Sequence, residues 1–313
     1  MIPVSTFQAQ PRHFWAHVKL LSEGLNYSLR GTIRRYTLKE IQQFLTDYGL
    51  SSSHLQDPLG PDYTYGDLIV AYINYRADVL ERSVLPNLMN REQAKADFEQ
   101  LRSNFKATLP QVYNKQSGIK RHPAYLTCIV NLLTEQVLDE RYFNHNPQGL
   151  IVVTNEGRPL RTFSRRMDGA YPSIVNPLAV WEIKEYYGTT TFGSRVADGV
   201  YETMLDGEEF AELQEHSSIE IKHYLIVDDY FTWWVKGKSY LCRIIHMLHM
   251  GLVDEVLFGK EVLTRWPEIV RSWLDIDFVR PDLRPLSPKV IRERRRPEGT
   301  LWENIELHES PGE

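Results

Sequence analysis

Two carboxylates and an ammonium group lie close together in the sequence between Asp168 and Lys184. Glu182 and Lys184 are two residues apart in the run Ala-Val-Trp-Glu-Ile-Lys at 179–184, whose apolar residues are typical of a β-strand. Residues two apart in a strand point to the same face of the sheet. We therefore expect Glu182 and Lys184 to project side by side, and we expect a neighbouring strand to bring Asp168 next to them.

These three side chains suit metal-assisted hydrolysis of a phosphodiester bond. Carboxylates are hard oxygen ligands of the kind that Mg²⁺ prefers, and an ammonium group beside them can orient or deprotonate a water molecule. Asp168 and Glu182 are therefore the candidate metal ligands and catalytic residues, and Lys184 is the candidate residue for positioning or activating the attacking water.

The arrangement resembles the PD-(D/E)XK nuclease superfamily, which includes most type II restriction endonucleases. Its signature is an Asp followed by Glu-x-Lys or Asp-x-Lys on the next strand, and here Met167 stands where the family often has proline. The resemblance implies a Mg²⁺ cofactor with Mn²⁺ as a substitute, the main-chain carbonyl of Ile183 as a further ligand, and products with 5′-phosphate and 3′-hydroxyl ends. Family members often carry another catalytic Glu on the first helix, for which Glu135 fits best and Glu140 is a rival.

The resemblance also implies an α/β (α+β) fold with a restriction-endonuclease-like core, in which helix, three strands, helix and strand build a central mixed sheet. Hydrophobic periodicity and turn residues around Asp168 fit this order. The expected elements are a helix at 126–137, strands at 149–154, 161–167 and 179–184, a helix that begins at the N-cap Ser194 and ends near Asp206-Gly207, and a strand at 219–227.

A second Glu-x-Lys, formed by Glu220 and Lys222, shows that the motif is loose. Its Asp partner by spacing would be Asp206, and the elements around it do not follow the family order, so we interpret this copy as part of the fourth strand. Structural alternatives stay open for the first copy: Asp168 could form a hairpin Asp-Gly turn, Glu182 and Lys184 could form a surface ion pair, and Glu135 could be a solvated helix residue.

The bulk composition bounds the class of protein. With 313 residues, 42% hydrophobic and 25% charged, the chain has room for one large or two modest globular domains. Cys128 and Cys242 lie in apolar helical patterns, which predicts buried free thiols in a reducing cytoplasm. We find no signal-peptide pattern and no run of eighteen apolar residues, so we expect a cytoplasmic protein that does not contact a membrane.

The net charge of −5 argues against indiscriminate nucleic-acid binding, so we expect DNA contacts from local basic patches. One patch crowds the strand that leads into Asp168, a second precedes a helix, and a third lies between Arg284 and Arg296. Each of these patches could instead be a solvated face or tail. The predicted DNA-binding residues are Arg34, Arg35, Arg161, Arg165, Arg166, Arg195, Arg294 and Arg295.

Composition and periodicity divide the chain into three regions. They are a helical amino-terminal region for DNA reading or dimerisation at 1–121, the nuclease core at 122–279 and a Pro- and Arg-rich arm at 280–313. Thr37 and Glu40 form a capping box that begins a helix ending at Gly49. This helix and the turn after it could be a helix-turn-helix or two packed helices. Longer helices are predicted at 65–88, 91–109, 239–251 and 256–273.

Two more groups have both a functional and a structural interpretation. The aromatic residues at 230–234 could stack on bases, although paired tryptophans near a strand end are also typical of a core or a dimer surface. His246 and His249 have a helical spacing that could seat zinc, but no third ligand accompanies them.

Together these features predict a Mg²⁺-dependent DNA endonuclease, a sequence-specific type II restriction enzyme that acts on double-stranded DNA. A single site of this kind cuts one strand, so double-strand cleavage suggests a homodimer. A gene for a cognate methyltransferase nearby would favour the interpretation as a restriction enzyme. The alternatives are a sequence-nonspecific defence or repair nuclease, which would leave a smear instead of discrete fragments, and a non-catalytic DNA-binding protein on the same fold.

Overall fold

The computed structural model describes residues 1–114, 118, 121–139, 141–187 and 193–276. The predicted basic segment between Arg284 and Arg296, including Arg294 and Arg295, lies outside the described residues. Glu140, the rival to Glu135, also lies outside them.

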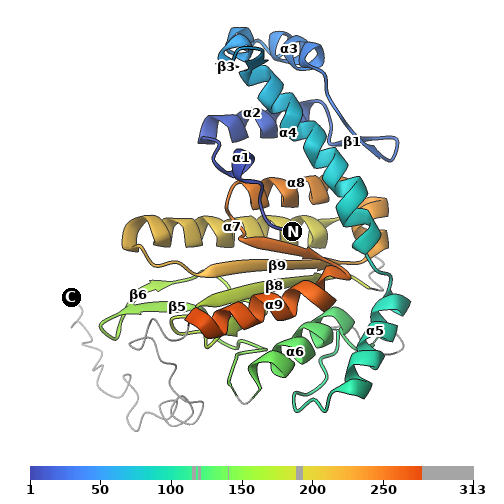
Figure 1. The fold of residues 1–313 in the computed structure, drawn as a ribbon, viewed down its shortest axis with the longest axis vertical. Helices are drawn as coiled ribbons and strands as arrows, with labels where there is room; N and C mark the ends of the chain where they lie inside the picture. Colours follow the sequence, from blue (N-terminus) through green and yellow to red (C-terminus); the bar gives the residue numbers. More distant parts are fainter. Residues whose placement is uncertain (115–117, 119–120, 140, 188–192, 277–313) are drawn as a thin grey trace, which may run out of the picture.

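A four-stranded mixed sheet forms the centre of the molecule (Figure 1). Its strands, in spatial order, are β10 (Glu255–Phe258), β9 (Lys222–Asp228), β8 (Ala179–Glu185) and β7 (Gly169–Tyr171). β7 runs antiparallel to β8, whereas β8, β9 and β10 are parallel to one another. Most residues of β8 and β9 are buried, as expected for central strands that are covered on both faces.

Helices cover both faces of this sheet (Figure 1). They are α6 (Tyr125–Leu138) and α9 (Glu261–Ile276) on one face, with α5 (Arg91–Asn104) packed against α6, and α7 (Ser194–Ser217) and α8 (Lys238–His249) on the other. Trp181 of β8 anchors the first face, since its ring centroid lies 5.4 Å from that of Trp266 and 5.6 Å from that of Trp273. None of the described helices is long and apolar enough to cross a membrane.

The amino-terminal region is helical, as predicted, and lies beyond α7 and α8 (Figure 1). Its elements are α1 (Ser5–Gln8), α2 (Arg12–Gly24), the hairpin β1 (Ser28–Leu29) and β2 (Thr32–Ile33), α3 (Leu38–Asp47), the 3₁₀ turn η1 (Ser53–Gln56), the hairpin β3 (Pro58–Gly60) and β4 (Tyr63–Thr64), and α4 (Tyr65–Val79). The predicted capping box of Thr37 and Glu40 is confirmed at the start of α3. The helix expected at 65–88 is α-helical only to Val79.

Beyond Val79 the chain continues as a π turn, η2 (Leu80–Val84), and a 3₁₀ turn, η3 (Leu85–Asn87). Pro86 has no N–H to donate, so it is poorly suited to continuing a regular α-helix here. A second π turn, η5 (Phe231–Lys236), contains most of the aromatic run at 230–234. Trp233 of this run is fully buried, whereas Phe231 is exposed.

The prediction that three successive strands before α7 build the central sheet is wrong in one respect. β5 (Val152–Asn155) and β6 (Arg158–Thr162) form a separate two-stranded sheet, and they do not extend the central one. Their turn has φ values of 49° at Glu156 and 79° at Gly157, as a tight hairpin turn requires. β6 exposes most of its side chains, which is unfavourable for a central strand. The strand that pairs with β8 is instead β7, which begins directly after Asp168.

Several predicted helix ends also differ, and the helix expected at 91–109 ends at Asn104. Gly193, not Ser194, is the N-cap of α7, and no side chain caps this end. α7 does not end at Gly207 but continues for ten more residues to Ser217. The segment expected to begin a helix at Val256 is strand β10, and the helix begins at Glu261. A short continuous apolar run fits a buried strand as well as a helix, which explains the last difference.

Candidate active site

Strand β8 presents Glu182 and Lys184 on the face covered by α7. Trp181 points to the opposite face, against α9, so the alternation of a strand turns its neighbour Glu182 toward α7. Glu182 is 1% exposed and Lys184 is 8% exposed. The Nζ of Lys184 donates a hydrogen bond of 2.8 Å to the Oε2 of Glu182. The pair is therefore buried, unlike the surface ion pair that was the alternative interpretation.

Asp168 lies at the start of β7 and reaches across to β8. Its main-chain N–H donates to the carbonyl of Trp181 at 3.1 Å, and its Oδ2 accepts from the N–H of Ile183 at 2.7 Å. Gly169 pairs with Trp181 within the sheet, so the Asp-Gly pair begins a strand and does not form a hairpin turn. A Cβ at Gly169 would lie 1.9 Å from the Trp181 indole, which explains why glycine follows Asp168.

The carboxyl group of Asp168 is crowded by protein although the residue keeps solvent access. This desolvation, together with the negative charge of Glu182, raises the pKa of Asp168 to about 6, and Lys184 partly opposes the shift. Asp168, Glu182 and Lys184 are therefore brought together by β7 and β8 and influence one another electrostatically.

Arg165 joins the site from the loop before β7. Its Nη1 lies 3.0 Å from the Oε1 of Glu182 and 2.5 Å from the Oδ2 of Asp206, and its Nη2 lies 3.1 Å from the Oε2 of Glu202. Lys184 also approaches Glu202, at 3.6 Å. The predicted DNA-binding residue Arg165 is thus engaged within the protein, between β8 and α7.

Asp206 is a residue of the site that the sequence patterns did not reveal. It lies in the middle of α7, is fully buried, and accepts a hydrogen bond from Arg165. Burial raises its pKa to about 7, against the opposing effect of Arg165. The available signal was its spacing: Gly199, Thr203 and Asp206 follow one another at helical intervals and are all buried on the same helix.

Gly199 allows α7 to lie close to Lys184. A Cβ at Gly199 would be 3.4 Å from the Cδ of Lys184 and 2.7 Å from the hydroxyl of Tyr186. The Tyr186 hydroxyl in turn donates to the carbonyl of Arg195 at 3.1 Å. The lysine is therefore enclosed between β8 and the first turns of α7, and its ammonium group has a restricted position beside Glu182.

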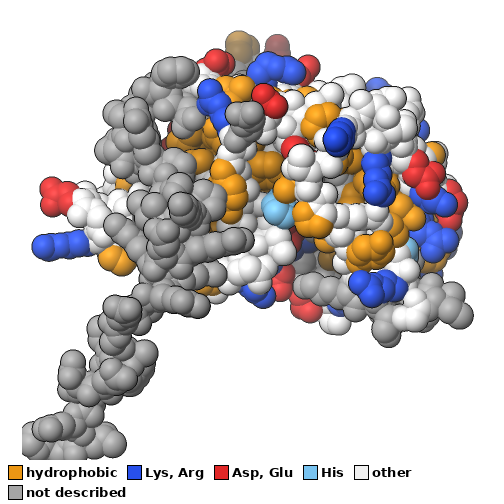
Figure 2. Space-filling view, turned by 90° about the horizontal axis from the view of Figure 1, so that it is seen from below, with side chains coloured by type: hydrophobic (Ala, Val, Ile, Leu, Met, Phe, Trp, Pro, Cys, Tyr) orange, Lys and Arg blue, Asp and Glu red, His pale blue; other side chains and the backbone are white. Residues whose placement is uncertain are grey.

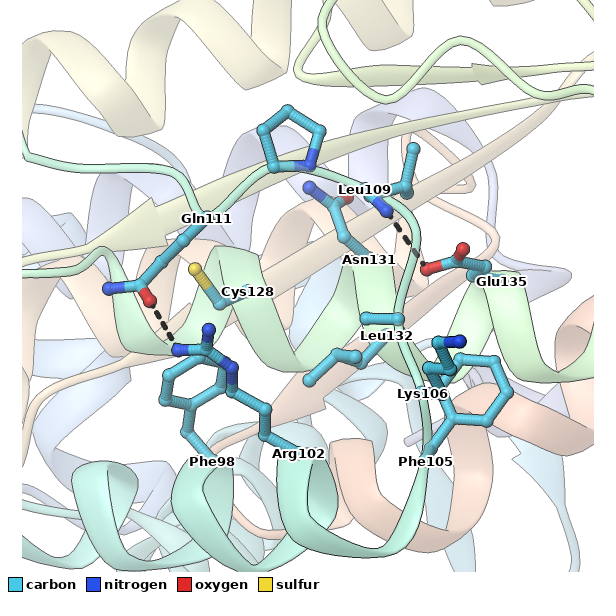
Figure 3. Close-up of a pocket in the computed structure, with 12 residues that line it drawn as sticks. Phe98, Arg102, Phe105, Lys106, Leu109, Gln111, Cys128, Asn131, Leu132 and Glu135 are labelled. Carbon is cyan, nitrogen blue, oxygen red and sulfur yellow. Dashed lines mark hydrogen bonds between the residues drawn. The ribbon is translucent and has the colours of Figure 1, made fainter.

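Glu135 does not lie beside Asp168, Glu182 and Lys184. It lines a cavity of about 270 Å³ between α5, α6 and the chain at 105–111 (Figure 3). Its Oε1 accepts from the N–H of Thr108 at 2.7 Å, and its Oε2 accepts from the N–H of Leu109 at 3.5 Å. Glu135 is 7% exposed, so it is not the solvated helix residue of the alternative interpretation either. Its contacts indicate that it fixes the loop after α5.

Most of the other predicted DNA-binding arginines in the described ranges are paired with acids. Arg34 lies 3.0 Å from Glu40, Arg35 lies 2.7 Å from Asp78, and Arg161 lies 2.8 Å from Glu212. By contrast, Arg166 and Arg195 are exposed and make no ion pair with the described residues. Figure 2 shows Lys and Arg side chains of the described residues scattered among acidic and apolar ones on the face viewed.

The second Glu-x-Lys lies elsewhere. Lys222 begins β9 and contacts Glu220 at 2.5 Å and Asp254 at 3.0 Å, and its side chain is 35% exposed. Its interpretation as part of the fourth strand is confirmed for Lys222, whereas Glu220 precedes the strand. This partly exposed cluster has no described contact with Glu182 or Lys184.

The predicted free thiols and the histidine pair also have defined places. Cys128 and Cys242 are free and buried, as predicted. The Nε2 of His246 lies 2.8 Å from the Nη1 of Arg76, and burial followed by the charge of Arg76 lowers the pKa of His246 well below its usual value. Across the described part of the chain, no group of three or more His, Cys, Asp or Glu side chains is arranged to hold a metal ion as it stands.

Two protein families match parts of the chain. Residues 89–273 match the family described as a domain of unknown function (DUF7687), and residues 1–83 match a second domain of unknown function (DUF7690). The first match covers more than half of the chain and includes the whole site. No curated protein and no solved structure matches the chain.

Proposed function

We propose that this chain, which belongs to the family of the domain of unknown function DUF7687, is a Mg²⁺-dependent DNA endonuclease. The observation that carries the proposal is the buried contact of 2.8 Å between Lys184 Nζ and Glu182 Oε2, beside the carboxylate of Asp168. These are the three residues that a PD-(D/E)XK nuclease would use. Glu182 and Lys184 lie on β8, and Asp168 directly precedes the neighbouring strand β7. A buried lysine hydrogen-bonded to a carboxylate is costly to maintain, which favours a chemical role over a structural one.

The order of the elements around the site supports the finer proposal of a restriction-endonuclease-like core. A helix (α6) precedes the antiparallel pair β7 and β8, and a helix (α7) then leads to the parallel strand β9. The separate hairpin of β5 and β6 differs from the expected order, in which three successive strands before α7 join the central sheet. This difference leaves the strands that carry Asp168, Glu182 and Lys184 in their expected relation.

The donor set fits a hard divalent cation such as Mg²⁺. Asp168 and Glu182 supply carboxylate oxygens, with the carbonyl of Ile183 as the proposed further ligand. The Oε1 of Glu182 is buried and makes no hydrogen bond, since its contact with Arg165 lacks hydrogen-bond geometry. A buried carboxylate oxygen without a hydrogen bond is unfavourable, and a metal cation bound directly to it would stabilise it further than the ionic contact with Arg165 does. Bound here, Mg²⁺ would stabilise negative charge on the scissile phosphate and on the leaving oxygen.

Side chains and main-chain groups of the protein would position the carboxylates and the attacking water. The N–H of Ile183 fixes the carboxylate of Asp168 by its 2.7 Å hydrogen bond. Glu182 fixes the ammonium group of Lys184, which has the donors needed to orient the attacking water. The charges around Lys184 favour its protonated form, because Glu182 and Asp168 raise its pKa against the effect of burial. The main role of Lys184 would therefore be to position the attacking water and to stabilise negative charge, as a protonated ammonium group can.

For the substrate we propose double-stranded DNA, and for the assembly a homodimer, because one such site cuts a single strand. The exposed arginines Arg166 and Arg195 flank the site in sequence, next to the loop of Arg165 and at the start of α7. Because they are exposed and close in sequence to the site, we propose that they hold phosphates beside it. A sequence-specific restriction enzyme remains the leading form of the proposal, with a nonspecific defence or repair nuclease as the alternative.

Digestion of unmethylated phage DNA with Mg²⁺ tests the proposal. We expect cleavage, ends that a ligase can rejoin because they carry 5′-phosphate and 3′-hydroxyl groups, and discrete fragments if the enzyme is sequence-specific. A smear would support the nonspecific alternative. Binding of the same DNA without cleavage, in either Mg²⁺ or Mn²⁺, would contradict the endonuclease and favour a non-catalytic DNA-binding protein.

A further inference from the structure

The charged cluster between β8 and α7 contains two buried carboxylate oxygens that accept no hydrogen bond from the described residues, although one of them is in ionic contact with Arg165. They are the Oε1 of Glu182 and the Oδ1 of Asp206, which make no hydrogen bond. The two residues are 1% and 0% exposed, so bulk water does not solvate them freely. A buried carboxylate oxygen without a hydrogen bond carries a desolvation cost, and a metal cation bound directly to these two oxygens would offset it.

A single guanidinium group holds the two carboxylates together. Nη1 of Arg165 lies 2.5 Å from Asp206 Oδ2 and 3.0 Å from Glu182 Oε1, one acid from the helix and one from the strand. Arg165 therefore occupies the place between β8 and α7 where a cation shared by these two acids would sit.

The charges of the cluster are not balanced. Within the described part of the chain, the carboxylates of Asp168, Glu182, Glu202 and Asp206 face two cations, Arg165 and Lys184. When all four acids are ionised, two negative charges remain, which is the charge that one divalent cation supplies. Electrostatics therefore favours uptake of such an ion at this place, and oxygen donors of this kind suit a hard cation.

The side chain of Arg165 can move out of the charged cluster. It lies in the loop between β6 and β7, outside any regular element, and its side chain is 24% exposed. The loop is held separately by Ser164, whose N–H and hydroxyl both donate to Glu209. The guanidinium group can therefore swing toward solvent while its backbone stays anchored beside the site.

We propose that Arg165 is a built-in counter-ion for the metal-free site, that a divalent cation displaces it, and that Asp206 then serves as an additional carboxylate ligand from α7. The displaced guanidinium group stays next to the site, where it can pair with a phosphate of the DNA backbone. This inference rests on the proposed function for the role of the metal, but it makes a separate statement about metal affinity.

Calorimetric titration of the full chain with Mn²⁺ at pH 8, without DNA, tests this statement. Replacing Arg165 by Gln removes the competing cation, so we expect roughly tenfold tighter Mn²⁺ binding. Replacing Asp206 by Asn removes a ligand, so we expect Mn²⁺ binding to weaken by about 10- to 100-fold. The matched control is Arg161→Gln, which removes another arginine paired with α7 acids and should leave the Mn²⁺ affinity unchanged.

Unchanged or weaker Mn²⁺ binding by Arg165→Gln, or unchanged binding by Asp206→Asn, would overturn the proposal. If Arg165→Gln does not fold, Arg165→Lys decides the question. It keeps the charge but loses the two-carboxylate bridge, so it should bind Mn²⁺ more tightly than the wild-type protein, and equal or weaker binding would overturn the proposal.

DNA cleavage separates this inference from the proposed function. If Arg165→Gln binds Mn²⁺ more tightly and Asp206→Asn binds it more weakly, but the wild-type protein never cuts DNA, the inference stands and the endonuclease falls. If the wild-type protein cuts DNA and both variants keep wild-type Mn²⁺ affinity, the endonuclease stands and the inference is wrong.

Discussion

The main-chain N–H of Ile183 donates a 2.7 Å hydrogen bond to the carboxylate of Asp168, which lies fifteen residues earlier in the chain. This bond joins the start of β7 to the strand that carries Glu182 and Lys184. It holds the Asp168 carboxylate, which directly precedes β7, close enough to Glu182 and Lys184 on β8 for their charges to influence its pKa. The geometry of the candidate site therefore depends on the pairing of β7 with β8.

Metal dependence follows from the donor set. Cleavage of DNA should stop in excess chelator and return with Mg²⁺ or Mn²⁺, whereas Ca²⁺ should support DNA binding without turnover because it is larger and less demanding in geometry. A gel assay of cleavage beside a filter-binding assay measures both properties. Full cleavage in excess chelator would remove the metal-dependent mechanism.

The buried carboxyl of Asp228 gives a prediction for stability. It accepts hydrogen bonds of 2.8 Å from the N–H groups of Met89 and Asp229 and a further one from the Tyr187 hydroxyl, and burial raises its pKa from 3.8 to about 7. An acid with a raised pKa holds a proton in the folded state that the unfolded chain releases. Its contribution to the free energy of unfolding therefore decreases as pH rises between about 4 and 7.

Asp228→Asn should flatten this part of the pH profile, by up to ~1.4 kcal/mol for each pH unit. Urea denaturation at several pH values between 4 and 8 measures the slope for both proteins. Asp47→Asn, which changes an exposed carboxyl on α3, serves as the control and should leave the slope as it is. Equal slopes for the wild-type protein and Asp228→Asn would show that Asp228 has an ordinary pKa.

Gly207 gives a prediction about packing. A Cβ at this position would lie 2.3 Å from the main-chain oxygen of Leu252, so Gly207→Ala should lower the free energy of unfolding by roughly 1–3 kcal/mol. Gly60→Ala is the control, because its nearest neighbour would be 3.9 Å away. Urea denaturation compares the two, and a neutral Gly207→Ala would mean that α7 can move away from Leu252 at little cost.

The same glycine shows where sequence reasoning fails. Asp206-Gly207 has the composition of a helix end, yet α7 continues because Gly207 permits a close approach to Leu252. The tertiary contact outweighs the local preference of glycine, and it is not visible in the local pattern. The role of Asp206 was missed for this reason, since a residue at a frayed helix end would not be expected in a buried site.

Other features could be read directly from the sequence. The capping box of Thr37 and Glu40 is a local motif, and the alternation in β8 fixes which side chains share a face, so both follow from short-range rules. The pairing of β7 with β8 and the separation of the β5–β6 hairpin depend on long-range burial. Exposure along β6 and the fit of Gly169 against Trp181 decide them.

The basic segment between Arg284 and Arg296 lies outside the described residues, and its predicted contact with DNA phosphates stays a prediction. If it binds phosphates, removing its arginines should weaken binding to all DNA sequences and reduce the dependence of affinity on salt. Sequence preference should survive, because phosphate contacts position a protein and base contacts specify the site. Filter binding at several salt concentrations, with a chain truncated after Pro281, gives the slope. An unchanged slope would identify a solvated tail.

The most direct test of the central claim compares the two Glu-x-Lys pairs on one DNA substrate. Glu182→Gln and Lys184→Met should each reduce the rate of Mg²⁺-dependent cleavage by about 10²-fold or more, while DNA binding and the far-UV circular dichroism spectrum are retained. Lys222→Met should cut at nearly the wild-type rate, because the side chain is partly exposed and lies apart from the site. Cleavage that survives Glu182→Gln and Lys184→Met, or that is lost in Lys222→Met alone, would contradict the account.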